Sequence, residues 1–218
     1  MTREELIKKV ALKMDEISSS DEVIASVGTG DNNPIYTQIN NLLNESVNDV
    51  LMKAPVYRLH SHIASVVSSN PKDLFVGSGI ERKAAVINVP DDFIRLVSIT
   101  DALFQRPIND FATEGDDIDK RQHNKFLVAK SAKPVAVFSS VANGRTITCY
   151  SYGPKDTPSP TLLYIKRYDK DRDTSADTEL DEYMSDLVSW VCAGRVFAAQ
   201  GDINKSKICD ENALALMV

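Results

Sequence analysis

The stretch Val89–Val97 reads VPDDFIRLV and places two adjacent carboxylates between a proline and an apolar run. Proline interrupts a β-ladder because it lacks a backbone N–H, and aspartate is common in turns because its side chain bonds nearby backbone N–H groups. The pattern predicts a corner between two strands: Pro90 ends the first, Asp91 and Asp92 satisfy the turn, and Phe93 anchors the second. A catalytic pair of carboxylates would need a chain-distant partner in a cleft, and the sequence offers no obvious one.

Strand patterns continue on both sides of this corner. Short runs rich in β-branched and aromatic residues, bounded by Pro, Gly or Asn, predict strands at 85–89, 93–99, 134–141, 145–152 and 161–167. Asn143 and Gly144 separate two of these runs and predict a tight hairpin, because the central residues of such a turn adopt positive φ. The polar, acidic residues 113–125 predict a loop or a short helix.

Apolar residues at helical spacing flank the β region. Thr2 and Glu5 have the spacing of a capping box and precede an apolar stripe that ends near Ile17. A second stripe follows Pro34 and ends before Ala54-Pro55. Two further helices are predicted, from about residue 180 to 200 and from 204 to the C-terminus, whereas residues 56–70 fit either a helix or a strand.

The order of elements predicts an α+β fold. Residues 1–70 form an N-terminal helical part, residues 71–175 form an antiparallel β insertion, and residues 176–218 form a C-terminal helix and tail that pack on the N-terminal helices. The striped helices at the two ends of the chain each need an apolar partner, and packing them on each other satisfies both. We therefore expect one composite helical domain from which the β region projects.

Composition restricts the function. The 218 residues are 43% hydrophobic and 26% charged, which is ordinary for a globular protein. No apolar run approaches the ~20 residues that span a bilayer, and residues 1–10 lack the apolar core of a signal peptide. The net charge of −6 argues against a protein that grips nucleic acid by neutralising its phosphates. We expect no membrane contact and no specific DNA binding.

Three patterns resemble metal sites, and each fails a test of spacing. The three cysteines, Cys149, Cys192 and Cys209, form no C-x-x-C pair and are read as packed, reduced thiols. His60 and His62 could share one side of a strand, but no further ligand completes a set. The carboxylates Asp169, Asp171, Asp173 and Asp177 match part of an EF-hand loop, yet Thr174 replaces its glycine and Leu180 its final glutamate. A solvated acidic turn is the favoured interpretation, with weak Ca²⁺ binding left open.

No enzyme signature emerges from the remaining motifs. The segments Gly28–Gly30 and Gly77–Gly79 lack the residues that complete a phosphate-binding loop. No serine has the G-x-S-x-G context of a hydrolase nucleophile. The sequence therefore predicts no catalytic residue and no cofactor.

The C-terminal tip is unusually apolar for a chain end, since chain ends are normally solvated. It contains Leu214, Leu216, Met217 and Val218. Either the tip folds back on its own helical body or it docks on a neighbouring subunit. Our hypothesis is that this tip and the β insertion supply contacts outside the monomer.

The arrangement resembles the head-to-tail connector proteins (adaptors or neck rings) of short-tailed, crAss-like bacteriophages. The resemblance covers about residues 2–200 and lies in the order of short motifs: LMKAP at 51–55, VPDDFIRLV at 89–97, RPI at 106–108, KPV at 133–135, Cys149-Tyr150, LYI at 163–165, and DLVSW at 186–190 with Ala193. Many relatives place Trp just before the Arg-Pro, where this chain has Phe104-Gln105.

The resemblance implies a non-enzymatic α+β subunit, one of twelve in a closed ring beneath the portal. Such a ring lies in the neck of the virion and is assembled in the host cytoplasm. It contacts the portal and other tail proteins, extends the DNA channel, and lets DNA pass without specific binding. Three alternatives stay open: another tail or collar subunit, a Ca²⁺-dependent or carbohydrate-binding β module, and a hydrolase with scattered carboxylates.

Overall fold

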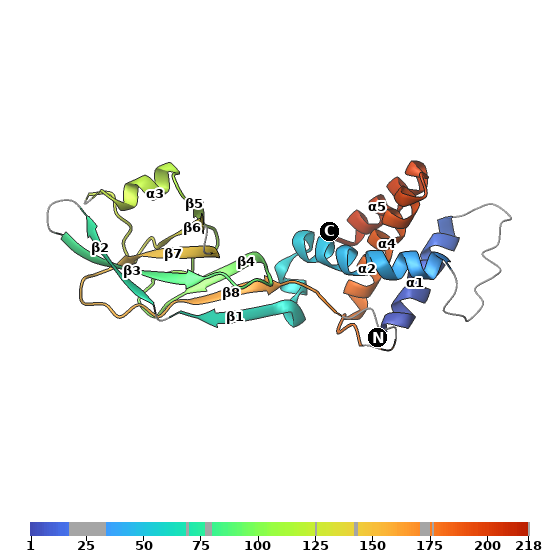
Figure 1. Cartoon of the computed structure of the whole chain (residues 1–218), viewed down its shortest axis with the longest axis horizontal. Coiled ribbons are helices and arrows are strands. Elements are labelled where there is room, and N and C mark those ends of the chain that lie inside the picture. The colour runs from blue at the N-terminus through green and yellow to red at the C-terminus, as the bar shows by residue number, and fades with distance from the viewer. Residues whose placement is uncertain are drawn as a thin grey trace. The chain divides into compact units, whose positions relative to one another are not determined.

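The chain has an α+β fold, as the sequence predicts, and forms two compact units (Figure 1). The computed structural model describes residues 1–17, 34–68, 70–76, 80–124, 126–141, 144–170, 175 and 177–217. The helical unit comprises Met1–Ser61 and Arg167–Val218, and the β unit comprises His62–Lys166. The chain thus enters the β unit from one helical segment and returns to the helical unit afterwards.

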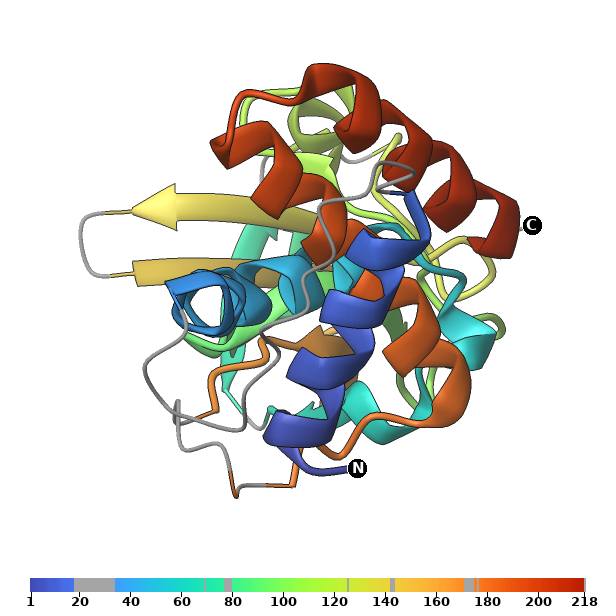
Figure 2. The same ribbon diagram turned by 90° about the vertical axis from the view of Figure 1, so that its right-hand side faces the viewer.

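Helix α4 is the centre of the helical unit. It spans Glu182–Ala199 and packs against three other helices: α1 (Arg3–Ile17), α2 (Pro34–Lys53) and α5 (Ile203–Met217) (Figure 2). Ten of its 18 residues are buried. The C-terminal helix α4 packs on the N-terminal helices α1 and α2, whereas the tail, which forms helix α5, packs mainly on α4.

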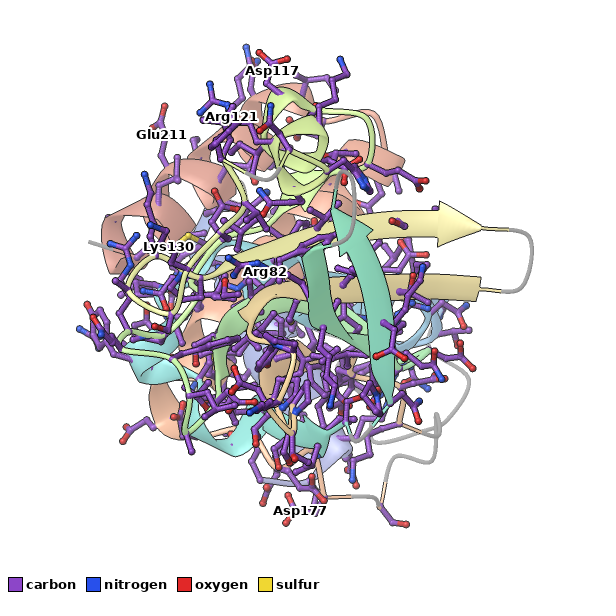
Figure 3. All side chains as sticks on the ribbon, turned by 90° about the vertical axis from the view of Figure 1, so that its left-hand side faces the viewer. Arg82, Asp117, Arg121, Lys130, Asp177 and Glu211 are labelled. Carbon is purple, nitrogen blue, oxygen red and sulfur yellow. The ribbon has the colours of Figure 1, made fainter. Side chains whose placement is uncertain are left out.

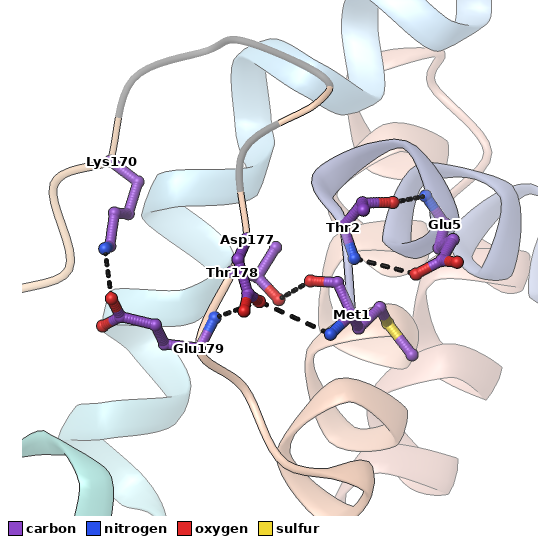
Figure 4. Close-up of polar contacts among 7 residues, drawn as sticks. All are labelled: Met1, Thr2, Glu5, Lys170, Asp177, Thr178 and Glu179. Atoms are coloured by element: carbon purple, nitrogen blue, oxygen red, sulfur yellow. Dashed lines mark hydrogen bonds and ion pairs between the residues drawn. The ribbon is translucent and has the colours of Figure 1, made fainter.

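The predicted capping box begins α1. The Thr2 backbone N–H donates to Glu5 Oε2 at 2.8 Å, and the Glu5 N–H donates to Thr2 Oγ1 at 3.2 Å (Figure 4). These reciprocal bonds satisfy backbone donors that a helix start leaves without partners. The backbone bond from Thr2 holds the pKa of the Glu5 carboxyl below its usual value.

A ladder of asparagines on α2 holds neighbouring segments. Asn40, Asn44 and Asn48 recur every four residues and therefore share one helix face. The fully buried Arg3 donates to Asn40 Oδ1 at 2.5 Å and to Asn44 Oδ1 at 2.8 Å. Asn48 exchanges two hydrogen bonds with the backbone of Tyr168. The ladder thus ties α1 and the segment after the β unit to α2, a role that the apolar stripe alone did not predict.

A tight connection joins α4 to α5. Gly201 has a φ of +86°, a conformation that glycine adopts without a steric penalty, and it stops α4. The carboxylate of Asp202 then accepts the backbone N–H of Lys205 at 3.1 Å, which caps the first turn of α5. Further along, Gly194 lets the two helices approach closely, since a Cβ there would lie 3.1 Å from Cys209 Cβ.

Two sheets form the β unit. The three-stranded sheet has the order β1-β8-β4 and the five-stranded sheet has the order β2-β3-β7-β6-β5. The strands are β1 (Ile63–Val67), β2 (Pro71–Val76), β3 (Ile80–Asn88), β4 (Phe93–Thr100), β5 (Ala112–Thr113), β6 (Val135–Val141), β7 (Gly144–Tyr152) and β8 (Thr161–Lys166). The short helix α3 (Asp117–Gln122) precedes β6, and Figure 3 labels its Asp117 and Arg121.

The β core lies between these sheets. Residues of β3 and β7, such as Ile87 and Ile147, pack in one apolar cluster with Ile99 of β4 and Leu162 of β8. Ala84, Val137 and Tyr150, neighbours of such residues on β3, β6 and β7, point to the opposite face of the five-stranded sheet and form a second, smaller cluster with Ala129 of the segment before β6. This alternation follows from the two-residue period of a strand.

The ambiguous segment 56–70 contains two short 3₁₀ helices, Val56–Arg58 and His60–His62, followed by β1. The β unit therefore starts at His62 rather than at residue 71, because β1 pairs along its whole length with β8. It also ends earlier, at Lys166 rather than near residue 175. Strand β2, which was not predicted, follows directly and pairs with β3.

The predicted hairpin is present between β6 and β7, but its turn differs by one residue. Val141 pairs with Gly144, so Gly144 is the first residue of β7 and not a central residue of the turn. Its φ of +128° agrees with a glycine at this place. Asn143 lies outside the described residues. Strand β4 is only partly covered, since Ile94–Ser98 are all partly buried.

Candidate interaction surface

The corner at Val89–Phe93 carries the chain from one sheet to the other. It connects β3 of the five-stranded sheet to β4 of the three-stranded sheet. The Phe93 N–H donates to the Pro90 carbonyl at 3.1 Å and closes the turn. Arg145 of β7 holds the corner from the side, because its carbonyl accepts the Val89 N–H and its guanidinium donates to the Pro90 carbonyl.

Asp92 has a different partner from the one its sequence context suggested. Its Oδ1 accepts the hydroxyl of Tyr164, on β8, at 3.0 Å, while the turn is closed by backbone atoms. The ring of Phe93 stacks on the ring of Tyr164 with centroids 5.7 Å apart. Burial, reinforced by the bond to Asp92, raises the pKa of Tyr164 to about 12. Asp92 therefore fastens the corner to β8, and Asp91 is exposed to solvent.

In the acidic turn before α4, Asp177 makes contacts that hold the turn in place. Asp177 Oδ1 accepts the Glu179 N–H at 3.0 Å and lies 3.4 Å from the amino group of Met1 (Figure 4). The bond from Glu179, followed by the charge of the amino group, lowers the pKa of the Asp177 carboxyl. Lys170 and Glu179 form an ion pair beside it at 2.7 Å. Asp171, Asp173 and Thr174 lie outside the described residues, as do Gly28–Gly30 and Gly77–Gly79.

The described side chains of the remaining metal candidates belong to no cluster of ligands. In the described part of the chain, no group of three or more His, Cys, Asp or Glu side chains is placed to hold a metal ion. His62 is buried. The side chain of His60 is not among those that the structure describes. All three cysteines are buried and free, so the prediction of packed thiols is confirmed. Burial raises the pKa of Cys149 and Cys209 to about 12 and that of Cys192 to about 11.

The end of α5 carries the apolar residues that the sequence analysis singled out as a possible interface. Only Cys209 and Ala213 of this helix are buried, and Cys209 faces Gly194 of α4. Leu214 is 59% exposed, Leu216 is exposed and Met217 is partly buried. Val218 lies outside the described residues. The helix that carries the tip therefore packs on α4 of its own helical body, while Leu214 and Leu216 are exposed.

A second group of exposed residues was missed by the sequence analysis. Tyr57 is exposed, and the Arg58 guanidinium lies 4.3 Å from the ring centroid of Tyr183, at the start of α4. The Tyr183 hydroxyl donates to the Leu216 carbonyl at 3.1 Å, which connects this group to the tip of α5. Tyrosine and arginine are enriched at protein interfaces. The sequence shows Tyr57 and Arg58 as neighbours, but only the fold places them beside α5.

Comparisons with known proteins do not identify the chain. No protein-family model matches it, and no curated protein matches its sequence significantly. Among the described residues, no helix is both long enough and apolar enough to cross a membrane.

Proposed function

We propose that the chain is a structural subunit of the neck of a tailed bacteriophage, where copies form a closed ring between portal and tail. The ring extends the DNA channel and offers a platform on which the tail docks, without an enzymatic step or a cofactor. The order of motifs along the chain supports this proposal, since it resembles that of head-to-tail connectors. A helical unit built from both ends of the chain, with an inserted β unit, is the architecture that this resemblance implies.

The observation that carries the proposal is the exposure of apolar side chains at the end of α5. Leu214 and Leu216 are exposed at the end of a helix that is held by two small buried residues. Exposed apolar side chains that gather at one end of a helix are candidates for an interaction site. A closed ring needs one surface that meets a different surface on the next copy, and the side of α5 can supply one of the two.

The charge of the chain agrees with this role. A net charge of −6 gives the ring an overall repulsion from the DNA phosphates. Repulsion of this kind favours passage of DNA over retention. The Tyr57, Arg58 and Tyr183 group adjoins the tip of α5 and enlarges the surface available for contact.

The test compares the wild type with two variants of α5. Leu214→Lys combined with Leu216→Lys places charges on the proposed surface, whereas Glu211→Lys places one lysine on an exposed site of the same helix as a control. Each protein is mixed with purified portal from the same virus and is measured by light scattering and negative-stain microscopy. We expect a collar on the portal for wild type and control, and its loss for the double variant at unchanged thermal stability.

Two results would contradict the proposal in different ways. A double variant that assembles like the wild type would remove α5 from the interface while leaving the ring intact. A wild type that stays monomeric in the presence of portal would exclude the connector function itself.

A further inference from the structure

A short loop of the β unit presents two adjacent large apolar side chains to solvent. Phe126 is 79% exposed and Leu127 is 57% exposed, and both lie between α3 and β6. Single apolar residues on a surface need no explanation, but an adjacent pair that includes an aromatic ring is a candidate docking point. We refer to these two residues as the Phe126–Leu127 loop.

The loop is held in place on both sides of the apolar pair. Asn124 Oδ1 accepts the Phe126 N–H at 3.0 Å, and the Asn124 carbonyl accepts the Val128 N–H at 2.9 Å. The side chain of the buried Gln122 accepts the Ala129 N–H at 2.9 Å, and Val128 and Ala129 are themselves buried. Because the backbone is ordered in this way, binding a partner here costs little conformational freedom.

Basic residues flank the Phe126–Leu127 loop. The segment 120–133 contains five Lys or Arg residues and no Asp or Glu. Arg121, Lys130 and Lys133 are exposed, and Figure 3 labels the first two. In the described part of the chain, the ion pairs at α3 involve side chains other than these three. The loop is therefore an apolar point with a basic rim.

The end of α5 combines its apolar residues with charges of the opposite sign. The segment 208–218 contains Asp210 and Glu211 and no Lys or Arg. Both carboxylates are exposed and lie about one turn before Leu214. The last turn of α5 carries no basic side chain, so the negative end of the helix dipole is not offset within the helix.

The two units of the chain differ in charge in the same sense. Residues 62–166 contain 13 Lys or Arg and 11 Asp or Glu, whereas the helical unit contains 12 and 20. Lys207 of α5 and the neighbouring Arg58 are basic, but the helical unit as a whole is strongly acidic. Charge complementarity of this kind selects partners and fixes their orientation across an interface.

We propose that the Phe126–Leu127 loop of one copy docks on the end of α5 of the next copy and forms the repeating contact of the ring. This inference rests on the proposed function. A closed ring needs two different surfaces on each chain, and each unit exposes one apolar pair, with rim charges of opposite sign. Contacts of loop with loop, or of α5 with α5, would bring like charges together. The second copy is therefore bound in head-to-tail order.

Exchange of the rim charges tests the contact on purified portal. Lys130→Glu with Lys133→Glu reverses the rim of the loop, and Asp210→Lys with Glu211→Lys reverses the rim of α5. We expect each double variant alone to give about tenfold fewer portals with a collar, and the four substitutions in one chain to restore the collar. A single exposed charge contributes little, so Glu211→Lys by itself keeps the collar.

Removal of the apolar atoms tests the same loop independently. Phe126→Ser with Leu127→Ser should abolish the collar while the thermal stability of the free chain stays unchanged, because both side chains are exposed. Val67→Ser is the matched control, since it removes apolar atoms from a 64% exposed site on the other sheet of the β unit. We expect the control to form collars like the wild type.

Photo-crosslinking identifies the molecule that covers the loop. A benzoylphenylalanine replaces Phe126, and collars are assembled on portal from a mixture of ¹⁵N-labelled and unlabelled copies. Mass spectrometry then shows which peptide is joined to the loop and whether the two peptides come from different copies. We expect crosslinks to α5, with half or fully mixed labels as the two isotopes are combined at random.

Each other outcome overturns the inference. Crosslinks within one copy, to its own α5 or to residues 18–33, would mean that the chain covers its own loop. Crosslinks to the portal would assign the loop to that contact instead. Collars formed by both reversed variants, or no recovery when all four substitutions are combined, would exclude this contact but leave the ring in place. A wild type that forms no collar would overturn the proposed function and this inference together.

Discussion

Helices α4 and α5 follow each other in the chain and pack together, yet they differ sharply in burial. Ten of the 18 residues of α4 are buried, against two of the 15 residues of α5. Helix α4 is surrounded by α1, α2 and α5, whereas α5 has α4 as its main neighbour. The comparison teaches that the buried apolar residues of α4 serve stability, whereas Leu214 and Leu216 of α5 are exposed and are the residues that we propose for assembly.

The largest effect is expected from a cavity in α4. Leu187 is fully buried, so Leu187→Ala should lower the free energy of unfolding by about 2–5 kcal/mol. Leu214→Ala on α5 removes the same atoms from an exposed site and should change it by less than about 0.5 kcal/mol. Urea unfolding of the two variants measures both values. Equal losses would mean that α5 is part of the core and that our distinction is wrong.

An intermediate effect is expected where the two helices touch. A Cβ at Gly194 would lie 3.1 Å from Cys209 Cβ and 3.3 Å from Asp210 Oδ1, so Gly194→Val forces α5 away from α4. Overpacking of this kind costs about 1–3 kcal/mol. Ala198→Val, at an exposed position of α4, is the control for the change in helix propensity. Faster proteolysis within α5 of the Gly194 variant alone would show that the helices separate there.

Alkaline pH should weaken the same contact. Burial raises the pKa of the Cys209 thiol to about 12, above its ordinary value of 9.0. At a pH between these two pKa values, the thiol is protonated in the folded state and ionised in the unfolded state. Its contribution to stability is complete below about pH 9 and is lost as the pH rises through about 12. Cys209→Ala should flatten the decline of the melting temperature above pH 9, and an unchanged slope would show that this thiol is not protected by α4.

A small effect is expected from Asp92 at the corner of the β unit, because its side chain is exposed, like those of Leu214 and Leu216 on α5. Asp92→Asn keeps an oxygen that can accept the Tyr164 hydroxyl, so the loss of unfolding free energy should stay below about 1 kcal/mol. Phe93→Ala at the same corner empties a buried site and should cost roughly 3–5 kcal/mol. Chemical denaturation of both variants separates the contribution of the Asp92–Tyr164 hydrogen bond from that of the buried Phe93 ring.

Periodic patterns were enough to predict the helices and most strands. The stripe of Leu6, Val10 and Met14 is buried, and the Thr2–Glu5 capping box begins the first helix. The corner at Pro90 lies between two strands, as its residues indicated. Local signals of this kind depend on neighbours in the chain, which a sequence displays directly.

Tertiary pairing could not be predicted in the same way. The five residues of β1 fit either a helix or a strand by their own composition. They form a strand because they pair with β8, almost one hundred residues later in the chain. The partner of Asp92 is on β8 rather than in the turn, and α5 packs on α4 rather than on the N-terminal helices. For the candidate surface, the apolar residues of the tip were visible in the sequence, but their exposure beside Tyr183 was set by packing.

The central claim is that the chain is a structural subunit of a ring on the portal. The most direct measurement is the ratio of this chain to portal protein in purified virus particles, determined by quantitative mass spectrometry. The account predicts one copy of the chain for each portal subunit. Absence of the chain from the particles, or a copy number typical of the capsid lattice or a tail tube, would contradict it.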